Sequence, residues 1–359
     1  MSKKNIFYKI IEFLTGIITL ILIIIPMFGI FFMYFNNPGN EYNKIDYTEI
    51  DGIRRRDDGA FYFEVRRGET AQSVGTRLER AGLIRSRYFW NIIGRFEKEF
   101  IKSGTYRLDM PMSQIEIYHL LVSGRQTLHR VTIPEGVTLS KMAKILEYED
   151  ICTEEEFMNA AADPEIINEY RIPGRSMEGY LFPDTYFFPS GYSAKEVVKT
   201  MADNFFRRIE IIDPSIKELT PRQLNEKVII ASIVEREYRI PEEAAIMAGV
   251  FYNRLDINMG LQSCATVEYV ITEILGLPHP GFITGADLEV DNRYNTYKWS
   301  GLPPGPISAP GAIALKAALF PEETNYFYFR LEDEDTGSHI FSRTNEEHNR
   351  AGRLWTPPR

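Results

Sequence analysis

The first pattern along the chain is an uninterrupted apolar run near its N-terminus. Residues 13–35 carry no charge and are dominated by Ile, Leu, Phe and Met. As a helix, this run is long enough to span the ~30 Å hydrocarbon core of a bilayer. No small-x-small cleavage site follows it, which favours a retained single-pass anchor over a removed signal peptide. Lys3, Lys4 and Lys9 precede the run, so the positive-inside rule predicts a cytoplasmic tail at 1–12 and the rest of the chain outside.

Beyond the anchor, the pattern predicts a linker and then a small α+β module. Residues 36–58 are polar and charged, which is typical of a juxtamembrane linker. Alternating or β-rich stretches predict strands, and apolar positions with helical spacing predict helices. The expected strands are 61–65 and 104–108, and the expected helices are 71–81, 88–98 and 114–123. We assign residues 59–129 to this module.

Residues 130–359 are expected to form a second, larger α+β domain. Capping residues and apolar spacing predict its helices, and short β-rich runs predict its strands. The expected helices are 139–146, a segment from 154, 221–238, 241–255, 312–319 and a short one after Thr344; the expected strands are 130–133, 326–331 and 339–342. The segment 177–186 and the region between 255 and 311 are expected to be largely loops.

One carboxylate stands out in the most apolar of these helices. The helix is expected to begin at the capping residue Thr220, and its isoleucines, Val234 and Tyr238 form one broad apolar arc. Glu235 falls at the edge of this arc and Glu237 falls inside it. A carboxylate in apolar surroundings is either partnered or has a raised pKa, and a raised pKa suits a proton donor near neutral pH. Spacing alone favours the ordinary alternative, a surface glutamate paired with Arg236 or Arg239.

Composition excludes some classes of function. The net charge of −9 and the lack of a Lys/Arg cluster argue against a nucleic-acid partner. The five histidines show no paired-ligand spacing, so we predict no metal site and no cofactor. Cys152 and Cys264 are the only cysteines, and the sequence leaves open whether they pair.

Five stretches, taken in order, carry a resemblance to a known family. They are Glu178-Gly-Tyr-Leu-Phe-Pro-Asp-Thr-Tyr186, Ala231-Ser-Ile-Val-Glu235-Arg-Glu237, Phe251-Tyr-Asn-Arg-Leu255 with Met259-Gly-Leu-Gln262, Tyr294-Asn-Thr-Tyr297 with Gly301-Leu-Pro-Pro-Gly305, and His339-x-Phe341 with Glu347-His-Asn349. They resemble the YceG-like endolytic murein transglycosylases (MltG family) from about residue 135 to 349. The module before them is similar to the family's LysM-like domain. The chain departs from the family pattern at Ser263-Cys264-Ala265, at Asp291-Asn292-Arg293 and at Ala309.

The resemblance implies a lyase of the bacterial cytoplasmic membrane that cuts nascent peptidoglycan strands. It would cleave the β-1,4 bond between N-acetylmuramic acid and N-acetylglucosamine, leave a 1,6-anhydro end and terminate strand elongation. Cell-wall synthases are the implied partners. Glu235 occupies the position of the catalytic glutamate. The expected substrate-binding residues are Tyr294, Asn295, Tyr297, Gln262 and Glu178, with Glu237 in a supporting role.

Two alternatives stay open at this point. A LysM-like module on a membrane tether also suits a peptidoglycan-binding scaffold without turnover. A second carboxylate, Glu178 or Asp184, would instead suit a two-carboxylate glycan hydrolase. Glu178 is equally suited to anchoring its loop through hydrogen bonds to backbone N–H groups.

Overall fold

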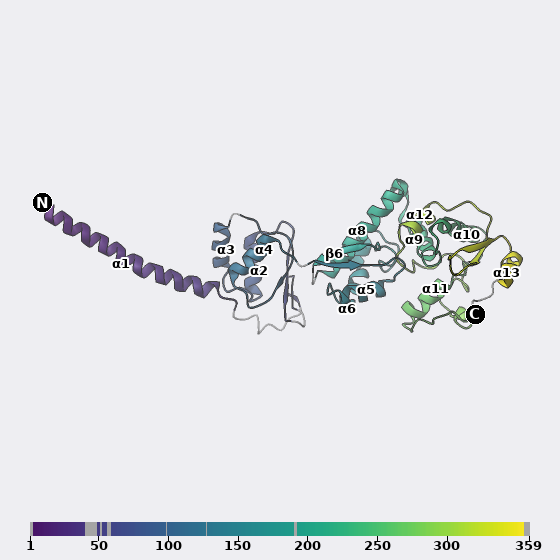
Figure 1. Ribbon diagram of the computed structural model, residues 1–359, viewed down its shortest axis with the longest axis horizontal. Helices are drawn as coiled ribbons and strands as arrows, with labels where there is room; N and C mark the ends of the chain where they lie inside the picture. The colour runs from purple at the N-terminus through teal and green to yellow at the C-terminus, as the bar shows by residue number, and fades with distance from the viewer. Residues whose placement is uncertain are drawn as a thin grey trace. The chain divides into compact units, whose positions relative to one another are not determined.

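The computed structural model describes residues 3–39, 49–50, 52–55, 59–97, 99–126, 128–189 and 192–354 (Figure 1). The chain divides into two compact units, each with its own hydrophobic core. The first comprises Met1–Leu128 with Pro189–Gly191, and the second comprises His129–Phe188 with Tyr192–Arg359.

The first unit begins with a long apolar helix, α1 (Lys3–Asn36). Its segment Phe13–Asn36 has a mean hydropathy of 2.7 and is long and apolar enough to cross a membrane. The C-terminal end of this helix contacts the rest of the unit. Phe35 stacks on Phe89, and the Asn36 Oδ1 accepts a hydrogen bond of 3.1 Å from the Ile115 N–H.

An antiparallel sheet with strand order β1-β2-β3-β4 forms one side of the first unit, within the described residues. Its strands are β1 (Glu49–Ile50), β2 (Ile53–Arg55), β3 (Phe61–Val65) and β4 (Gly104–Leu108). Three capped helices complete the unit: α2 (Ala71–Arg80), α3 (Arg87–Phe96) and α4 (Gln114–Ser123). Trp90 and Tyr106 are fully buried between these elements and anchor the core.

The second unit starts with short helices around a strand pair. Strand β5 (Leu128–Thr132) pairs with β6 (Thr185–Pro189). The helices are α5 (Leu139–Tyr148), α6 (Glu154–Ala161), α7 (Pro164–Glu169) and the long amphipathic α8 (Ala194–Ile212). Phe157 and Phe205 are fully buried in the core that these helices share with the rest of the unit.

Helix α9 (Pro221–Val234) is the buried centre of the second unit. It packs against α12 (Ala312–Leu319) and α10 (Ala244–Asp256), which lie beside it in Figure 1. All side chains from Val228 to Val234 are buried. The sequence of this stretch, Val-Ile-Ile-Ala-Ser-Ile-Val, has one polar residue, Ser232, and so offers no polar face to solvent. A helix that is apolar all round has to be enclosed on every side.

The remaining elements surround this centre. They are α11 (Cys264–Tyr269), which continues as a π-helical turn (Val270–Ile274), the antiparallel pair β7 (Tyr328–Leu331) and β8 (His339–Ser342), and α13 (Asn345–Leu354). Short 3-10 turns cover Pro214–Glu218, Pro241–Glu243 and Asp287–Glu289.

The mixed helix and sheet content and the single apolar N-terminal helix agree with the expected fold class. Several details differ from the predicted elements. The sequence analysis did not predict α8, α7 or β6, and it treated α11 as loop. It also extended α9 to Tyr238, whereas the helix ends at Val234 and Glu235 is its C-cap residue. Strands β1 and β2 fall within the segment expected to be linker, of which residues 40–48, 51 and 56–58 lie outside the described residues.

Gly179 offers a test of the packing around α9. Its φ is +82°, and an added Cβ would lie 2.4 Å from the Pro306 Cβ and 3.2 Å from the Val228 Cγ1. The substitution Gly179→Ala combines left-handed strain with overpacking, so we expect it to lower the free energy of unfolding of the second unit by ~2–4 kcal/mol. Hydrogen exchange of the α9 amides measures this loss. Gly174→Ala in the same loop, with no contact closer than 3.7 Å, is the control and should cost under ~1 kcal/mol. Equal losses would contradict the packing described here.

Candidate active site

Glu235 lies where α9 ends and the chain turns away from the core. Its backbone N–H still donates to the Ala231 carbonyl at 2.9 Å, so the helical geometry fixes its position. Its Oε2 accepts a 2.8 Å hydrogen bond from the Gly311 N–H. Its Oε1 lies 3.5 Å from the Tyr238 hydroxyl, a long hydrogen bond. One carboxyl oxygen is therefore held firmly, and the other is held only loosely.

Burial raises the pKa of the Glu235 carboxyl to about 7. The Gly311 N–H and the Arg236 guanidinium oppose this rise, because both favour the charged form. The nearby Glu135 carboxylate adds to it, because two like charges repel. Glu235 is thus a carboxyl group that holds its proton up to neutral pH, as a general acid requires.

Hydrogen bonds hold the segment that contacts Glu235 against α9. The buried Ser232 hydroxyl accepts from the Ile307 N–H at 3.1 Å, and the Ser308 hydroxyl donates to the Ser232 carbonyl at 3.0 Å. On the outer side, Gly136 N–H donates to the Ala309 carbonyl at 2.8 Å, and Ala309 N–H donates to the Val137 carbonyl at 2.8 Å. The Gly311 N–H therefore reaches Glu235 from a backbone that is fixed on both sides.

Glu135 is a second carboxylate near Glu235 that is not among the site residues expected from the sequence. A Cβ added to Gly311 would meet the Glu135 carboxylate, and a Cβ added to Gly136 would lie 3.6 Å from the Glu235 Cγ. The two glycines thus allow two carboxyl groups to approach the same stretch of backbone. No local sequence signal indicates this pairing, because Glu135 and Glu235 are far apart in the chain. Ala309 brings them together: its backbone bonds to Gly136 and Val137, and Gly311, two residues further on, bonds to Glu235.

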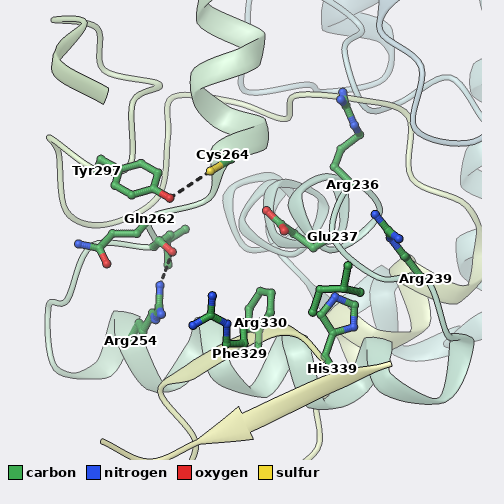
Figure 2. A pocket seen from close by; sticks show the side chains of 12 residues that line it. Arg236, Glu237, Arg239, Arg254, Gln262, Cys264, Tyr297, Phe329, Arg330 and His339 are labelled. Atoms are coloured by element: carbon green, nitrogen blue, oxygen red, sulfur yellow. Dashed lines mark hydrogen bonds between the residues drawn. The ribbon is translucent and has the colours of Figure 1, made fainter. Parts of the chain in front are cut away.

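Three of the expected site residues line one pocket of about 360 Å³, here called the arginine pocket (Figure 2). They are Gln262 and Tyr297, which were expected to bind substrate, and Glu237, which was expected to support the site. The Glu237 carboxyl accepts a hydrogen bond from the Ser263 hydroxyl, and burial raises its pKa. The Tyr297 hydroxyl lies 3.2 Å from the Cys264 Sγ. Arg236 also lines this pocket, and its guanidinium favours the charged form of Glu235.

Two other expected residues, Glu178 and Tyr294, line a different pocket of about 440 Å³ with Pro304, Gly305 and Pro306. Glu178 is buried, and its Oε2 accepts a 3.2 Å hydrogen bond from the Leu139 N–H. Its Oε1 has no hydrogen-bond partner in the described residues. Burial raises the pKa of Glu178 to about 8, so the group is neutral at pH 7.

Asn295 lies inside its loop. It is 0% exposed, its amide donates to the carbonyls of Leu288 and Val290 at 2.8 Å each, and its Oδ1 accepts from the Tyr297 N–H at 3.0 Å. These bonds use its donors within the protein. Asn295 therefore shapes the loop that carries Tyr294 and Tyr297.

The other candidate groups lie apart from Glu235. Asp184 accepts hydrogen bonds from Thr185 N–H, Asn204 and Arg208. Cys152 is buried in the core and Cys264 is exposed, and the two do not form the disulfide that the sequence left open. Among the described residues, no cluster of His, Cys, Asp and Glu is arranged to hold a metal ion.

The fold and this site can now be compared with known proteins. The model of the YceG-like family matches residues 63–353. The chain belongs to the YceG-like family. This confirms the resemblance drawn from the five sequence stretches.

Curated relatives of this YceG-like chain are named endolytic murein transglycosylase. A protein from Streptococcus pneumoniae (strain ATCC BAA-255 / R6) is 27% identical over 310 residues, which is 79% of this chain and 56% of that protein. One from Bacillus subtilis (strain 168) is 28% identical over 301 residues, covering 79% of this chain and 81% of that protein. The chain therefore spans little more than half the length of the pneumococcal relative.

A solved structure supports the fold of this YceG-like chain. The crystal structure of a YceG-like protein from Listeria monocytogenes superposes with a TM-score of 0.54 at 30% sequence identity. The match covers 81% of this chain and 98% of that one.

The buried carboxyl of Glu178 predicts a pH-dependent stability. Its folded pKa of about 8 exceeds the ordinary value of 4.5, so the folded state loses stability relative to the unfolded state as pH rises from about 4.5 to 8. Glu178→Gln keeps the acceptor for the Leu139 N–H and has no charge to bury. We expect its stability relative to wild type to improve by up to ~1.4 kcal/mol per pH unit in this window. Thermal unfolding at pH 5 and pH 8 tests this, and a pH-independent difference would contradict it.

Proposed function

We propose that this protein is a membrane-anchored peptidoglycan lytic transglycosylase, a lyase that cuts glycan strands internally with Glu235 as its catalytic acid. The observation that carries the proposal is a carboxyl group with a pKa of about 7 at the end of a buried helix. The names of the curated relatives supply the substrate class, the glycan strands of peptidoglycan.

The geometry of Glu235 suits a single-carboxylate mechanism. Its Oε2 accepts the Gly311 N–H, which leaves Oε1 to carry the acidic proton. Oε1 protonates the glycosidic oxygen, and the bond from C1 of N-acetylmuramic acid to that oxygen breaks. The carboxylate then accepts the proton of the C6 hydroxyl while the C6 oxygen bonds to C1. The products are a 1,6-anhydro end and a free N-acetylglucosamine hydroxyl, with no water consumed.

The loops around Glu235 supply the surfaces for the sugars. Tyr294 and Tyr297 present half-buried rings from one loop, and Gln262 is exposed at the edge of the arginine pocket. Aromatic faces suit the apolar faces of pyranose rings, and a glutamine amide suits hydroxyl and acetamido groups. In this proposal Asn295 holds the loop, Glu178 accepts from or donates to a sugar hydroxyl in its pocket, and Glu237 supports the site through its hydrogen bond with Ser263.

The N-terminal part of the chain suits a membrane-tethered enzyme. Helix α1 would anchor residues 13–35 in the cytoplasmic membrane with residues 1–12 inside, and residues 59–129 would form a LysM-like module. Residues 130–359 would be the catalytic domain outside. Such a tether keeps the active site near newly made strands, where it would terminate elongation next to the cell-wall synthases.

One observation favours a second candidate function. Glu135 is a carboxylate next to Glu235, and most glycan hydrolases use a pair of carboxyl groups as their catalytic residues. A hydrolase would place water oxygen at the new reducing end, whereas a transglycosylase would not. Cleavage in water enriched in oxygen-18 separates the two, because only hydrolysis labels the product.

Replacing the acid should abolish cleavage. We expect Glu235→Gln to lower turnover of uncross-linked glycan strands by roughly 10²–10⁴-fold, because an amide cannot donate the proton. Mass spectrometry of the products should show 1,6-anhydro ends with wild type and none with the variant. Glu226→Gln on the same helix, whose side chain is 44% exposed, is the matched control and should cleave normally. Near wild-type turnover by Glu235→Gln would remove the assignment.

The raised pKa also predicts the pH profile. The protonated form of Glu235 is the active one, so kcat/KM should fall about tenfold per pH unit above about 7. Glu135→Gln removes a neighbouring negative charge, which should move this fall to lower pH. Glu218→Gln, at an exposed position of a 3-10 turn, is the control and should leave the profile in place. An unchanged profile in Glu135→Gln would show that this carboxylate does not act on Glu235.

A further inference from the structure

The arginine pocket has more positive charge than its own acidic groups balance. Arg236 is paired with Glu268 at 2.6 Å. Arg239 and Arg330 also line the pocket, and neither has a salt bridge within the described part of the chain. The pocket carboxyl, Glu237, is driven towards its neutral form by burial.

Arg254 adds a buried charge with only neutral hydrogen-bond partners. It is 6% exposed, and its guanidinium donates to the carbonyls of Phe327 at 2.6 Å and Leu261 at 2.5 Å. A guanidinium has five N–H donors, so these two bonds do not use them all, and Arg254 lines the pocket. Burying a cation without an anion is costly, and burial lowers the pKa of Arg254 accordingly.

The arginines come from separate elements that meet only here. Figure 2 shows Arg254 from α10 and Arg330 from β7 on one side of the pocket, and Arg239 from the turn after α9 on the other side, towards His339. The Glu243 carboxylate already pairs with His339, whose Nδ1 lies 2.7 Å from it. The arrangement is an open, cationic recess next to the Glu235 turn.

We propose that the arginine pocket binds a carboxylate of the peptide stem carried by the glycan strand. This inference rests on the proposed function, because it takes a peptidoglycan strand as the ligand. In a strand that keeps its peptides, the lactyl carboxyl of N-acetylmuramic acid is tied up in an amide bond, so the free carboxylates are those of the stem peptides. Guanidinium groups bind carboxylates through paired hydrogen bonds, and Gln262 and Tyr297 supply neutral contacts at the rim. The pocket would thus distinguish strands whose stem carboxylates are free from strands in which they are amidated.

Binding to a variant that does not cleave provides the test. The full chain carrying Glu235→Gln, in detergent, is titrated with uncross-linked strands that keep their stem peptides and with the same strands after their stem carboxylates have been converted to amides. Adding Arg330→Gln or Arg239→Gln should weaken binding of the untreated strands about tenfold, the loss expected for one charged hydrogen bond, and should change binding of the amidated strands less than about twofold.

Two controls decide the outcome. Arg222→Gln removes an equal charge from an exposed site on α9, and it should change neither affinity by more than about twofold. The second control is the chain with Glu235→Gln alone, which should bind the amidated strands more weakly than the untreated ones. Equal affinity of this chain for the two kinds of strand, or equal losses on both in the arginine variants, would overturn the proposal.

This design keeps the two proposals separate. The binding difference is measured without turnover, so it can fail while wild type still produces 1,6-anhydro ends. If wild type produced no 1,6-anhydro ends but binding still depended on the stem carboxylates, the proposed reaction would be overturned and the pocket assignment would stand. Thermal unfolding of each arginine variant shows whether a loss of binding is a loss of folding.

Discussion

The enclosure of the last two turns of α9 is the constraint on which the rest of the second unit depends. Residues Val228–Val234 are buried on all sides, and the single hydroxyl among them, on Ser232, binds the segment that crosses the helix end. That segment supplies the Gly311 N–H to Glu235. Because the helix cannot rotate or shift in this shell, the first residue beyond it is fixed at the boundary between core and solvent. A desolvated but reachable carboxyl group is the result.

The turn after α9 distributes its polar side chains to different partners. Glu235 contacts Gly311, Arg236 pairs with Glu268, and Glu237 accepts from Ser263. If the helix had continued, these three side chains would have projected from it about 100° apart, in directions set by the helix alone. Ending the helix at Val234 lets Arg236 contribute both to the electrostatics of Glu235 and to the arginine pocket. The proposed acid and the proposed peptide pocket are thereby linked through one side chain.

Buried carboxyl groups with raised pKa values recur in this unit. Burial raises the pKa of Glu178, Glu235 and Glu237 above the ordinary value. Such groups are concentrated where function needs them. The excess of guanidinium groups in the arginine pocket is the complementary feature, since the single carboxyl group of that pocket, Glu237, does not balance them.

The sequence determined what is local. The apolar run of α1, the capped helices α4, α6 and α9, and the unusual carboxylate Glu235 all follow from neighbouring residues, because capping and periodicity act within a few positions. Only the tertiary structure decided which distant groups meet. The approach of Glu135 to Glu235 and the gathering of Arg239, Arg254 and Arg330 depend on contacts between segments up to about one hundred residues apart. The burial of Asn295 in its loop was also decided by the folded structure, through hydrogen bonds to Leu288 and Val290. Helix α8 was missed even though its pattern is local. The burial of the site residues and the charge balance of the arginine pocket depend on the complete packing, so only the folded structure could show them.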